Sequence, residues 1–381
     1  MENQSETVRV ALVHEWLVNF RGSEKVLLEL ARMFPDAVIY ASVLRRCELP
    51  EELAKRDIRT TFIQRLPWAH RLYQMYLFLM PLAYSWLDMW PYDLVITSSH
   101  ACANGVRPRD GATHVSYCYT PMRYAWSGYE DYRNSLRSPM ARAVMSLLMR
   151  LMRRWDYSTA QRVTQYIACS GEVAARIKRY YHRESTVIFP PATMDTAEPQ
   201  GAIADLLPEL AGGPFYLSLG RLVPYKRVDL AIEACRRLGR RLVIAGTGPE
   251  LDRLRALGGP AVHFITSFSD DDAKILYGSC SGFLFPGEED FGLTPVEAQL
   301  FGKPVVAFGR GGAVDTVIHM KTGVLFDEQS PAAVAKAIEL LEQTSFDAEA
   351  IRRHASQFSS ATFRSAILKS IQTIPRGGRQ L

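Results

Sequence analysis

The chain has 381 residues with a net charge of +5, and apolar residues make up 48% of it. At about 150 residues per domain this length predicts two domains, and the 22% of charged residues is typical of a globular protein rather than a disordered chain. No apolar run approaches the roughly 18 residues of a membrane span, and the polar first residues predict no signal peptide. The cysteines are scattered without paired spacing, which favours reduced thiols in a cytoplasmic protein over disulfides or a zinc site.

Short apolar runs alternate with amphipathic stretches through the first half of the chain. Runs of this kind are typical of parallel strands that are buried on both faces. We predict strands at residues 8–13, 38–43, 59–63, 93–97, 113–118, 165–169 and 186–189, with helices at about 23–33 and 171–181. This rhythm predicts an α/β domain with a parallel sheet over residues 1–190. Gly22, just before the first helix, lies where a phosphate-binding turn begins.

The segment from residue 62 to residue 90 is rich in aromatic side chains and poor in charge. One interpretation is a buried helix pair that packs on the sheet. The other is a surface that faces a membrane or a lipid, because amphipathic rings favour the interface. The sequence leaves both open. The aromatic residues concerned are Trp68, Tyr73, Tyr76, Phe78, Tyr84, Trp86 and Trp90.

A loop dense in rings and hydroxyl groups follows the predicted strand at 113–118. It contains Tyr119 and Arg123, and His100 stands just after the preceding predicted strand. Aromatic rings stack on sugar faces, and the fork of an arginine donates hydrogen bonds to hydroxyl or phosphate oxygens. These residue types therefore favour carbohydrate binding.

Residues 133–162 form a strongly basic helical stretch in which Asp156 is almost the only acid. A solvated helix face is the usual interpretation of such a run. The concentration of one charge sign beside Met and Leu favours instead contact with anionic lipid head groups or a lipid diphosphate. No motif that reads DNA or RNA occurs, so nucleic acid is not an expected partner. The arginines are Arg133, Arg137, Arg142, Arg150, Arg153, Arg154 and Arg162.

A polar, proline-containing stretch at 190–201 predicts a linker, after which the α/β rhythm restarts. We predict strands at 215–219, 241–245, 262–265, 282–285 and 305–307. Helices are expected to end near residue 238, to run from Pro295 to Phe301, and to span 332–341 and 358–374. This pattern predicts a second α/β domain over residues 202–357.

Two cations and two acids in the second half stand where predicted strands end. Arg221 and Lys226 precede a helix, and a helix N-terminus with two cations is a favourable diphosphate site. Glu289 lies in an acidic loop, and Glu297 lies near a helix start, where a carboxylate also gains from the helix dipole. Ligands bind at the carboxyl ends of strands in open α/β sheets. The acids at 270–272 stand at a predicted helix start and serve there as caps, so we predict no metal site.

The stretch Glu289-Asp-Phe-Gly-Leu-Thr-Pro-Val-Glu297 resembles the E-x7-E signature of the family 4 retaining glycosyltransferases, which use nucleotide sugars. The loop from Gly220 to Lys226 resembles the G-R-x4-K motif of the same family. The resemblance implies the GT-B fold, in which two doubly wound parallel-sheet domains face each other across a cleft. The first domain would bind the acceptor and the second the nucleotide sugar, and the helix at 358–374 would pack back on the first.

The same resemblance implies a role for each candidate residue. Arg221 and Lys226 would neutralise the donor diphosphate, which removes the need for a metal cofactor, and Glu289 would orient the sugar hydroxyls. Glu297 would bind the ribose. The other donor-binding positions are Gly22, Phe291, Gly292, Leu293, Gly311, Gly312, Ser267 and Phe268, and the acceptor side comprises Tyr119, Arg123 and His100. Many relatives have histidine where Tyr119 stands, and tyrosine is a poor base near neutral pH.

The run from Tyr117 to Tyr124 resembles a subgroup that uses GDP-mannose in bacterial surface-polysaccharide assembly. It implies α-mannosyl transfer with retention to a polyprenyl-diphosphate-linked saccharide, in exopolysaccharide or O-antigen assembly. No carboxylate stands as an evident nucleophile, so the donor phosphate is the expected proton acceptor. The protein would then be peripheral on the inner face of the cytoplasmic membrane. The alternatives are a UDP-hexose donor, a sugar-nucleotide-binding protein without turnover, and an epimerase of the same fold.

Overall fold

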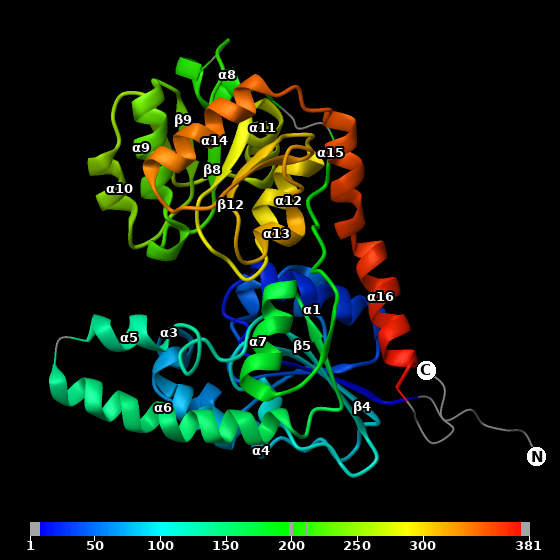
Figure 1. Ribbon diagram of the computed structural model, residues 1–381. Coiled ribbons are helices and arrows are strands. Elements are labelled where there is room, and N and C mark those ends of the chain that lie inside the picture. Colours follow the sequence, from blue (N-terminus) through cyan, green and yellow to red (C-terminus); the bar gives the residue numbers. More distant parts are fainter. Residues whose placement is uncertain (1–7, 137, 198–200, 211, 375–381) are drawn as a thin grey trace, which may run out of the picture. The chain divides into compact units, whose positions relative to one another are not determined.

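The computed structural model describes residues 8–136, 138–197, 201–210 and 212–374, and the chain divides into two compact units (Figure 1). The first unit extends to Pro191 and takes up the chain again from Ser360, and the second runs from Ala192 to Ser359. Each unit is built on one parallel sheet. The predicted linker at 190–201 contains the point at which the chain passes from the first unit to the second.

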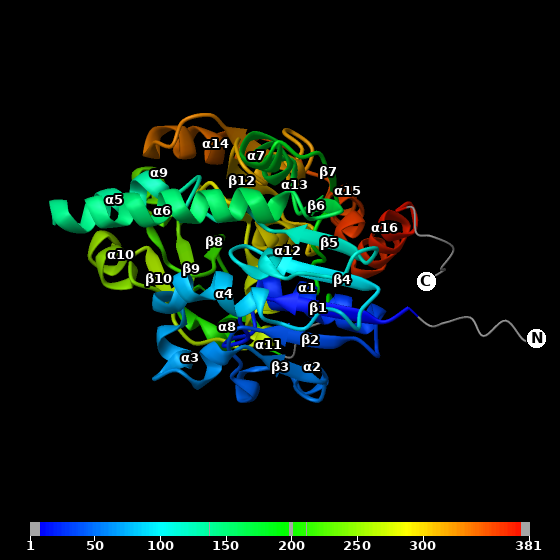
Figure 2. The same cartoon turned by 90° about the horizontal axis from the view of Figure 1, so that it is seen from below.

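The first sheet has seven strands in the order β3-β2-β1-β4-β5-β6-β7, all of them parallel (Figure 2). All residues of β1 are buried, as expected for a strand covered on both faces. The chain order reverses between β1 and β4, so the carboxyl ends of these two strands form the switch point of a doubly wound sheet. The strands are β1 (Val10–His14), β2 (Val38–Ala41), β3 (Ile58–Thr60), β4 (Leu94–Ser99), β5 (Thr113–Cys118), β6 (Gln165–Ala168) and β7 (Ser185–Val187).

The second sheet has six parallel strands in the order β10-β9-β8-β11-β12-β13. Its switch point lies between β8 and β11. The strands are β8 (Tyr216–Leu219), β9 (Leu242–Ala245), β10 (Val262–Ile265), β11 (Gly282–Phe285), β12 (Val305–Phe308) and β13 (Gly323–Phe326). Strand β13 was not predicted. The two sheets confirm the predicted fold class of two doubly wound parallel α/β domains.

The basic stretch of the first unit forms two helices rather than one: α5 (Tyr129–Ser135) and α6 (Pro139–Ala160). The residue before a proline disfavours helical backbone, so one helix does not continue through Ser138-Pro139. Instead Ser138 caps α6 by accepting a hydrogen bond from the N–H of Ala141. Arg137 lies outside the described residues. The other helices of this unit are α1 (Gly22–Met33), α2 (Glu51–Ala54), α3 (Ala69–Leu72), α4 (Met80–Ser85), α7 (Gly171–Tyr181) and α16 (Ser360–Gln372), with 3-10 turns η1 (Arg46–Glu48), η2 (Phe62–Arg65), η3 (Tyr73–Leu79) and η4 (Ala103–Gly105).

The aromatic segment at 62–90 is a series of short helical turns, η2, α3, η3 and α4, rather than a helix pair. Its inner side chains, among them Tyr84, are buried in the core of the first unit. Its outer side chains are not covered, since Trp68, Trp86 and Trp90 are between 68% and 72% exposed. The segment therefore has a buried side and an exposed aromatic side. Among the described residues, no helix has both the length and the apolar character that crossing a bilayer requires.

Two predictions about helix starts in the second unit can be compared with the structure. Ser269 and Asp272 each accept a hydrogen bond from the other's backbone N–H, which confirms that this acid belongs to a helix cap. Helix α12 begins at Leu293, so the predicted start at Pro295 was wrong. Proline fits there because the first N–H groups of a helix have no partner within it. The helices are α8 (Ile203–Leu206), α9 (Val228–Leu238), α10 (Leu251–Leu257), α11 (Asp270–Ser279), α12 (Leu293–Leu300), α13 (Ala313–Thr316), α14 (Pro331–Gln343) and α15 (Ala348–Ala355), with 3-10 turns η5 (Pro208–Leu210), η6 (Pro224–Lys226) and η7 (Ser356–Phe358).

Helix α16 belongs to the first unit, where it packs against α1 (Figure 1). The guanidinium of Arg364 lies 2.6 Å from Oε2 of Glu29, whose side chain is almost completely buried. Phe363 and Ile367 are buried on the inner side of the helix. The end of the chain is thus attached to the unit in which the chain began. The predicted single helix at 358–374 is divided between the turn η7 and α16.

Asp156 is a buried carboxylic acid near the end of α6. Its Oδ2 accepts hydrogen bonds from the indole N–H of Trp126 at 2.7 Å and from the hydroxyl of Tyr181 at 2.8 Å. Burial raises the pKa of Asp156 to about 7, although both hydrogen bonds oppose that rise. The acid that the sequence placed among arginines therefore joins α6 to two neighbouring segments and changes its charge near neutral pH.

Candidate functional site

The three predicted catalytic side chains come from two loops at the switch point of the second sheet. Arg221 and Lys226 lie in the loop after β8, and Glu289 lies in the loop after β11. Strands β8 and β11 are hydrogen-bonded neighbours, so their following loops meet. A pocket of about 10 Å³, enough for one water molecule, is lined by all three residues. The structure therefore brings these three side chains together.

An ion pair joins two of them. Nζ of Lys226 lies 2.7 Å from Oε1 of Glu289, and the two side chains are 16% and 17% exposed. Burial by itself lowers the pKa of Lys226, but the negative charges of Glu289 and Glu297 raise it above its ordinary value. Lys226 is therefore a cation. Arg221 is exposed and forms no ion pair with any other residue that the structure describes, so its guanidinium is available to an anion.

Glycines allow the loops around this ion pair to pack backbone against backbone. A Cβ on Gly287 would lie closer than 3 Å to the backbone of Lys226. A Cβ on Gly311 would lie as close to the carbonyl of Glu289, and the N–H of Gly312 donates a hydrogen bond to that carbonyl at 2.8 Å. Only glycine fits at such approaches. The predicted glycine-rich loop is therefore held directly against the loop that carries Glu289.

Glu297 is held in place by a tyrosine that the sequence did not reveal as part of the site. The carboxylate is 6% exposed, and its Oε2 accepts a hydrogen bond from the hydroxyl of Tyr277 at 2.9 Å. Burial, together with the charge of Glu297, raises the pKa of Tyr277 well above its ordinary value. The phenol therefore keeps its proton and remains a donor, which fixes the orientation of the carboxylate.

The remaining predicted donor-binding residues of this unit also lie after the carboxyl ends of strands in the second sheet. Gly292 has a φ of 86° and immediately precedes Leu293, the first residue of α12. Phe291 is buried, with its ring centroid 5.8 Å from that of Phe358. Ser267 and Phe268 follow β10, which is two strands from β8 and therefore about 10 Å away at ordinary strand spacing.

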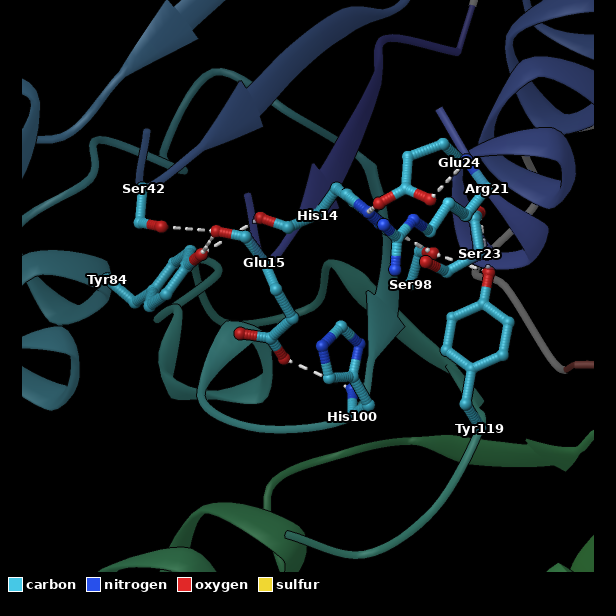
Figure 3. Close-up of polar contacts among 10 residues, drawn as sticks. All are labelled: His14, Glu15, Arg21, Ser23, Glu24, Ser42, Tyr84, Ser98, His100 and Tyr119. Atoms are coloured by element: carbon cyan, nitrogen blue, oxygen red, sulfur yellow. Dashed lines mark hydrogen bonds and ion pairs between the residues drawn. The ribbon is translucent and has the colours of Figure 1, made fainter. Parts of the chain in front are cut away.

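A second polar cluster lies at the switch point of the first sheet (Figure 3). Its centre is Glu15, which follows β1 and is completely buried. The carboxylate accepts hydrogen bonds from the backbone N–H groups of residues 100–103 at 2.8–3.2 Å and from the hydroxyl of Ser99 at 3.0 Å. The hydroxyl of Tyr84 lies within hydrogen-bond distance of the backbone carbonyls of His14 and Glu15 and shares its one proton between them. Glu15 therefore fixes the loop that carries His100.

A line of hydrogen bonds connects His14 to Tyr119 (Figure 3). The hydroxyl of Tyr119 donates to the carbonyl of Ser23 at 3.0 Å, and it lies 2.9 Å from Oγ of Ser98. Oγ of Ser98 lies 2.9 Å from Nδ1 of His14. Because each hydroxyl has one proton, Ser98 then donates to Tyr119 and His14 donates to Ser98 through Nδ1.

The other ring nitrogen of His14 lies 3.6 Å from Oε1 of Glu24. Burial alone would raise the pKa of Glu24, but the hydrogen bond and the charge of His14 lower it below its ordinary value. The hydrogen-bond directions thus place a proton on Nδ1 of His14, while its Nε2 faces the carboxylate of Glu24. The second oxygen of Glu24 accepts from the N–H of Arg21 at 2.9 Å, next to the predicted residue Gly22.

The predicted acceptor-side residues have different surroundings. Burial raises the pKa of Tyr119 well above its ordinary value, so its occupied hydroxyl belongs to the buried hydrogen-bond network and is no general base. His100 is half-buried, with its ring centroid 4.7 Å from that of Trp16 and 6.2 Å from that of Tyr119. Arg123 is half-buried, and its backbone carbonyl accepts a hydrogen bond from Gly128. His100 and Tyr119 are therefore neighbours.

Comparison with protein families gives a match in each half of the chain. Residues 20–193 match the family described as Glycosyltransferase Family 4, and residues 207–358 match Glycosyl transferases group 1. The chain belongs to the family 4 glycosyltransferases. The resemblance seen in the motifs is thereby confirmed.

Curated relatives of this family 4 member have varied names. This chain is 33% identical over 195 residues to D-inositol 3-phosphate glycosyltransferase of Salinispora arenicola. The matched region covers 45% of this chain and 44% of the relative. The chain is 36% identical over 147 residues to a GDP-mannose-dependent phosphatidylinositol monomannoside mannosyltransferase of Mycobacterium tuberculosis, covering 34% of this chain and 38% of the relative. It is 30% identical over 155 residues to D-rhamnosyltransferase WbpZ of Pseudomonas aeruginosa, covering 39% and 41%. The chain spans less than half the length of the curated relatives it matches.

Solved structures similar to this family 4 member share its fold over nearly the whole chain. HepE of Anabaena in complex with UDP-glucose has a TM-score of 0.69 at 19% identity, covering 96% of this chain and 100% of HepE. Sucrose-phosphate synthase from Thermosynechococcus elongatus has a TM-score of 0.67 at 16% identity, covering 96% and 98%. At these identities the similarity shows the fold, which is the predicted GT-B class.

Four polar residues of the two clusters in this family 4 member were missed from the sequence: His14, Glu15 and Glu24 in the first unit, and Tyr277 in the second. A signal for the first two was present, because a histidine and a glutamate directly follow an apolar strand at the edge where ligands bind. No local signal marked Tyr277, since its partner Glu297 lies on another helix.

Proposed function

We propose that this protein transfers a hexose from a nucleoside diphosphate to an acceptor hydroxyl with retention of configuration. The observation that supports this most strongly is the meeting of Arg221, Lys226 and Glu289 at the switch point of the second sheet. Two cations beside a half-buried carboxylate match the two parts of such a donor, since the phosphates are anionic and the sugar offers hydroxyl donors.

In the proposed reaction, negative charge develops on the phosphate as it leaves the sugar. Arg221 and Lys226 offset that charge without the reorganisation that water would need. Donor binding moves the ammonium of Lys226 from Glu289 toward phosphate, and this frees the carboxylate to accept hydrogen bonds from the sugar. Glu297, held by Tyr277, binds the ribose, and the donor phosphate takes the proton of the acceptor hydroxyl. We propose that no metal is needed, because the two side-chain cations already offset the negative charge on the phosphates.

For the donor we propose GDP-mannose, with a UDP-hexose as the alternative. One relative is named as GDP-mannose-dependent, and one structure of the same fold was solved with UDP-glucose, so the names alone favour neither base. The preference for GDP-mannose rests on the resemblance of the stretch from Tyr117 to Tyr124.

The test is a calorimetric melting experiment with GDP, GDP-mannose, UDP and UDP-glucose, each with and without EDTA. We expect the guanosine pair to stabilise the protein, because a ligand at a hundred times its Kd adds about 2.7 kcal/mol to the free energy of unfolding. The same shift is expected in EDTA. If only UDP-glucose stabilises the protein, the proposed donor becomes a UDP-hexose instead of GDP-mannose. If no nucleotide stabilises it, the proposed function is contradicted.

For the acceptor we propose a polyprenyl-diphosphate-linked saccharide of exopolysaccharide or O-antigen assembly, reached by binding to an anionic membrane surface. Helix α6 supports this with exposed apolar side chains at helical spacing, Val144, Leu147 and Leu151, and with exposed Arg150 and Arg154 on the same helix. A peripheral location on the inner face of the cytoplasmic membrane follows from this proposal.

Vesicle sedimentation tests the membrane proposal. We expect the protein to sediment with vesicles that contain phosphatidylglycerol and to stay largely in solution with pure phosphatidylcholine. The double variant Leu147→Glu, Leu151→Glu should lose most of this binding. Its control, Leu340→Glu with Leu368→Glu, makes the same change at exposed leucines on α14 and α16 and should bind like wild type. Equal binding by both double variants would contradict the role of α6.

A further inference from the structure

An apolar cavity of about 350 Å³ opens in the first unit between η3 and α6. This volume lies in the range of small-molecule pockets. Leu77 and Phe78 of η3 form one side, and Met145 and Leu148 of α6 form the other. The rings of Tyr124 and Tyr132, whose centroids are 4.9 Å apart, also line it. Apart from Gln74, the lining is therefore made of hydrocarbon and aromatic side chains, which favours a hydrocarbon ligand over a sugar.

The side chain of Trp16 separates the cavity from His100, one of the proposed acceptor residues. Trp16 forms part of its lining, and the same ring meets His100 edge-on at 4.7 Å between centroids. Tyr124, which lines the cavity too, directly follows Arg123 in the chain. A molecule whose polar end lies at His100 and Arg123 thus has an apolar space next to that end.

The charge beside the cavity is positive. Helix α6, which supplies one side of it, carries Arg142, Arg150, Arg153 and Arg154, and its only acid is Asp156, which is buried. The guanidinium of Arg153 lies 4.3 Å from the ring centroid of Tyr129 on α5. Arginine suits phosphate because it donates to two oxygens at once. The surroundings therefore complement an anion attached to an apolar chain.

We propose that this cavity binds the first isoprene units of a polyprenyl diphosphate, with the diphosphate held by neighbouring arginines. The inference rests on the proposed function, in which the acceptor is lipid-linked, and adds a binding site for its hydrocarbon part. A single cavity accepts one chain, whereas a bilayer phospholipid has two. The branched methyl groups of an isoprenoid also pack well against rings such as those of Trp16, Tyr124 and Tyr132.

The experiment measures binding of geranylgeranyl diphosphate to the full chain by titration calorimetry, with the ligand below its micelle concentration. We expect saturable binding by wild type, and at least tenfold weaker binding of inorganic pyrophosphate. In Ala141→Trp a large ring fills the cavity from α6, so its Kd should rise at least tenfold. The control Ala143→Trp places the same ring at an exposed position of α6 outside the cavity lining and should keep the wild-type Kd.

Three results would overturn the proposal: no binding by wild type, an unchanged Kd in Ala141→Trp, or pyrophosphate that binds as tightly as the prenyl compound. Dioctanoyl phosphatidic acid is titrated as a competitor, and displacement by it at equal concentration would show an acyl-lipid site instead. Nucleotide-sugar melting shifts are recorded on the same samples. If prenyl binding fails while the nucleotide shift persists, only the cavity inference fails, whereas loss of the nucleotide shift in wild type contradicts the proposed function.

Discussion

Replacing Glu289 with glutamine is expected to lower the rate of sugar transfer by at least about a hundredfold, the size of effect seen when one preorganised polar group is removed from an active site. Glutamine keeps the shape of the side chain but removes the charge that pairs with Lys226 at 2.7 Å. It also replaces one oxygen acceptor with a donor, so the sugar hydroxyls lose a partner. The measurement is the initial rate of transfer from GDP-mannose to a lipid-linked acceptor.

The matched control is Glu288→Gln, which makes the same change one residue earlier in the same half-buried loop. This variant should retain the wild-type rate within a few-fold. Circular dichroism and urea unfolding should show both variants folded like wild type. A folded Glu289→Gln protein with wild-type activity would rule out the role that we propose for this carboxylate.

Replacing Glu15 with leucine is expected to destabilise the first unit by about 3–5 kcal/mol, the usual cost of removing one partner from a buried charged network. The carboxylate is the shared acceptor for the N–H groups of residues 100–103 and for the hydroxyl of Ser99. Leucine is similar in size but accepts no hydrogen bond, so these donors are left without that partner in the interior.

Urea unfolding followed by tryptophan fluorescence measures this effect in the first unit alone, because every tryptophan of the chain lies between residues 16 and 155. Glu48→Leu at the exposed turn η1 is the control and should change the free energy of unfolding by no more than about 0.5 kcal/mol. Equal midpoints for the two variants would mean that the loop after β4 does not depend on Glu15.

The fold could be predicted from the sequence because most of its strands are apolar along their whole length. A parallel strand covered by helices on both faces has no polar alternation, so runs such as Val10–Val13 are plain in the chain. Element ends were less certain. Helix α12 begins before Pro295, and the basic stretch divides at Ser138-Pro139, because proline acts through backbone geometry that apolar periodicity does not record.

The donor side of the site could be predicted because its residues belong to continuous motifs, each placed directly after a buried strand. The network around Glu15 could not, since it joins residues more than 80 positions apart in the chain. The same limit applies to Tyr119. The resemblance placed it on the acceptor side, and the sequence did not show that its hydroxyl forms hydrogen bonds with Ser98 and Ser23.

All strands of each sheet run in one direction, so the end of the sheet where the strands begin differs from the end where they finish. The turns at the amino ends of the strands carry none of the candidate residues. Gly111 before β5 and Gly239 before β9 lie in such turns, and a Cβ on either would have no atom within 4 Å beyond its chain neighbours. These turns are therefore suitable positions for inserting an affinity tag or a tether to a solid support, at the edge of each unit opposite its polar cluster.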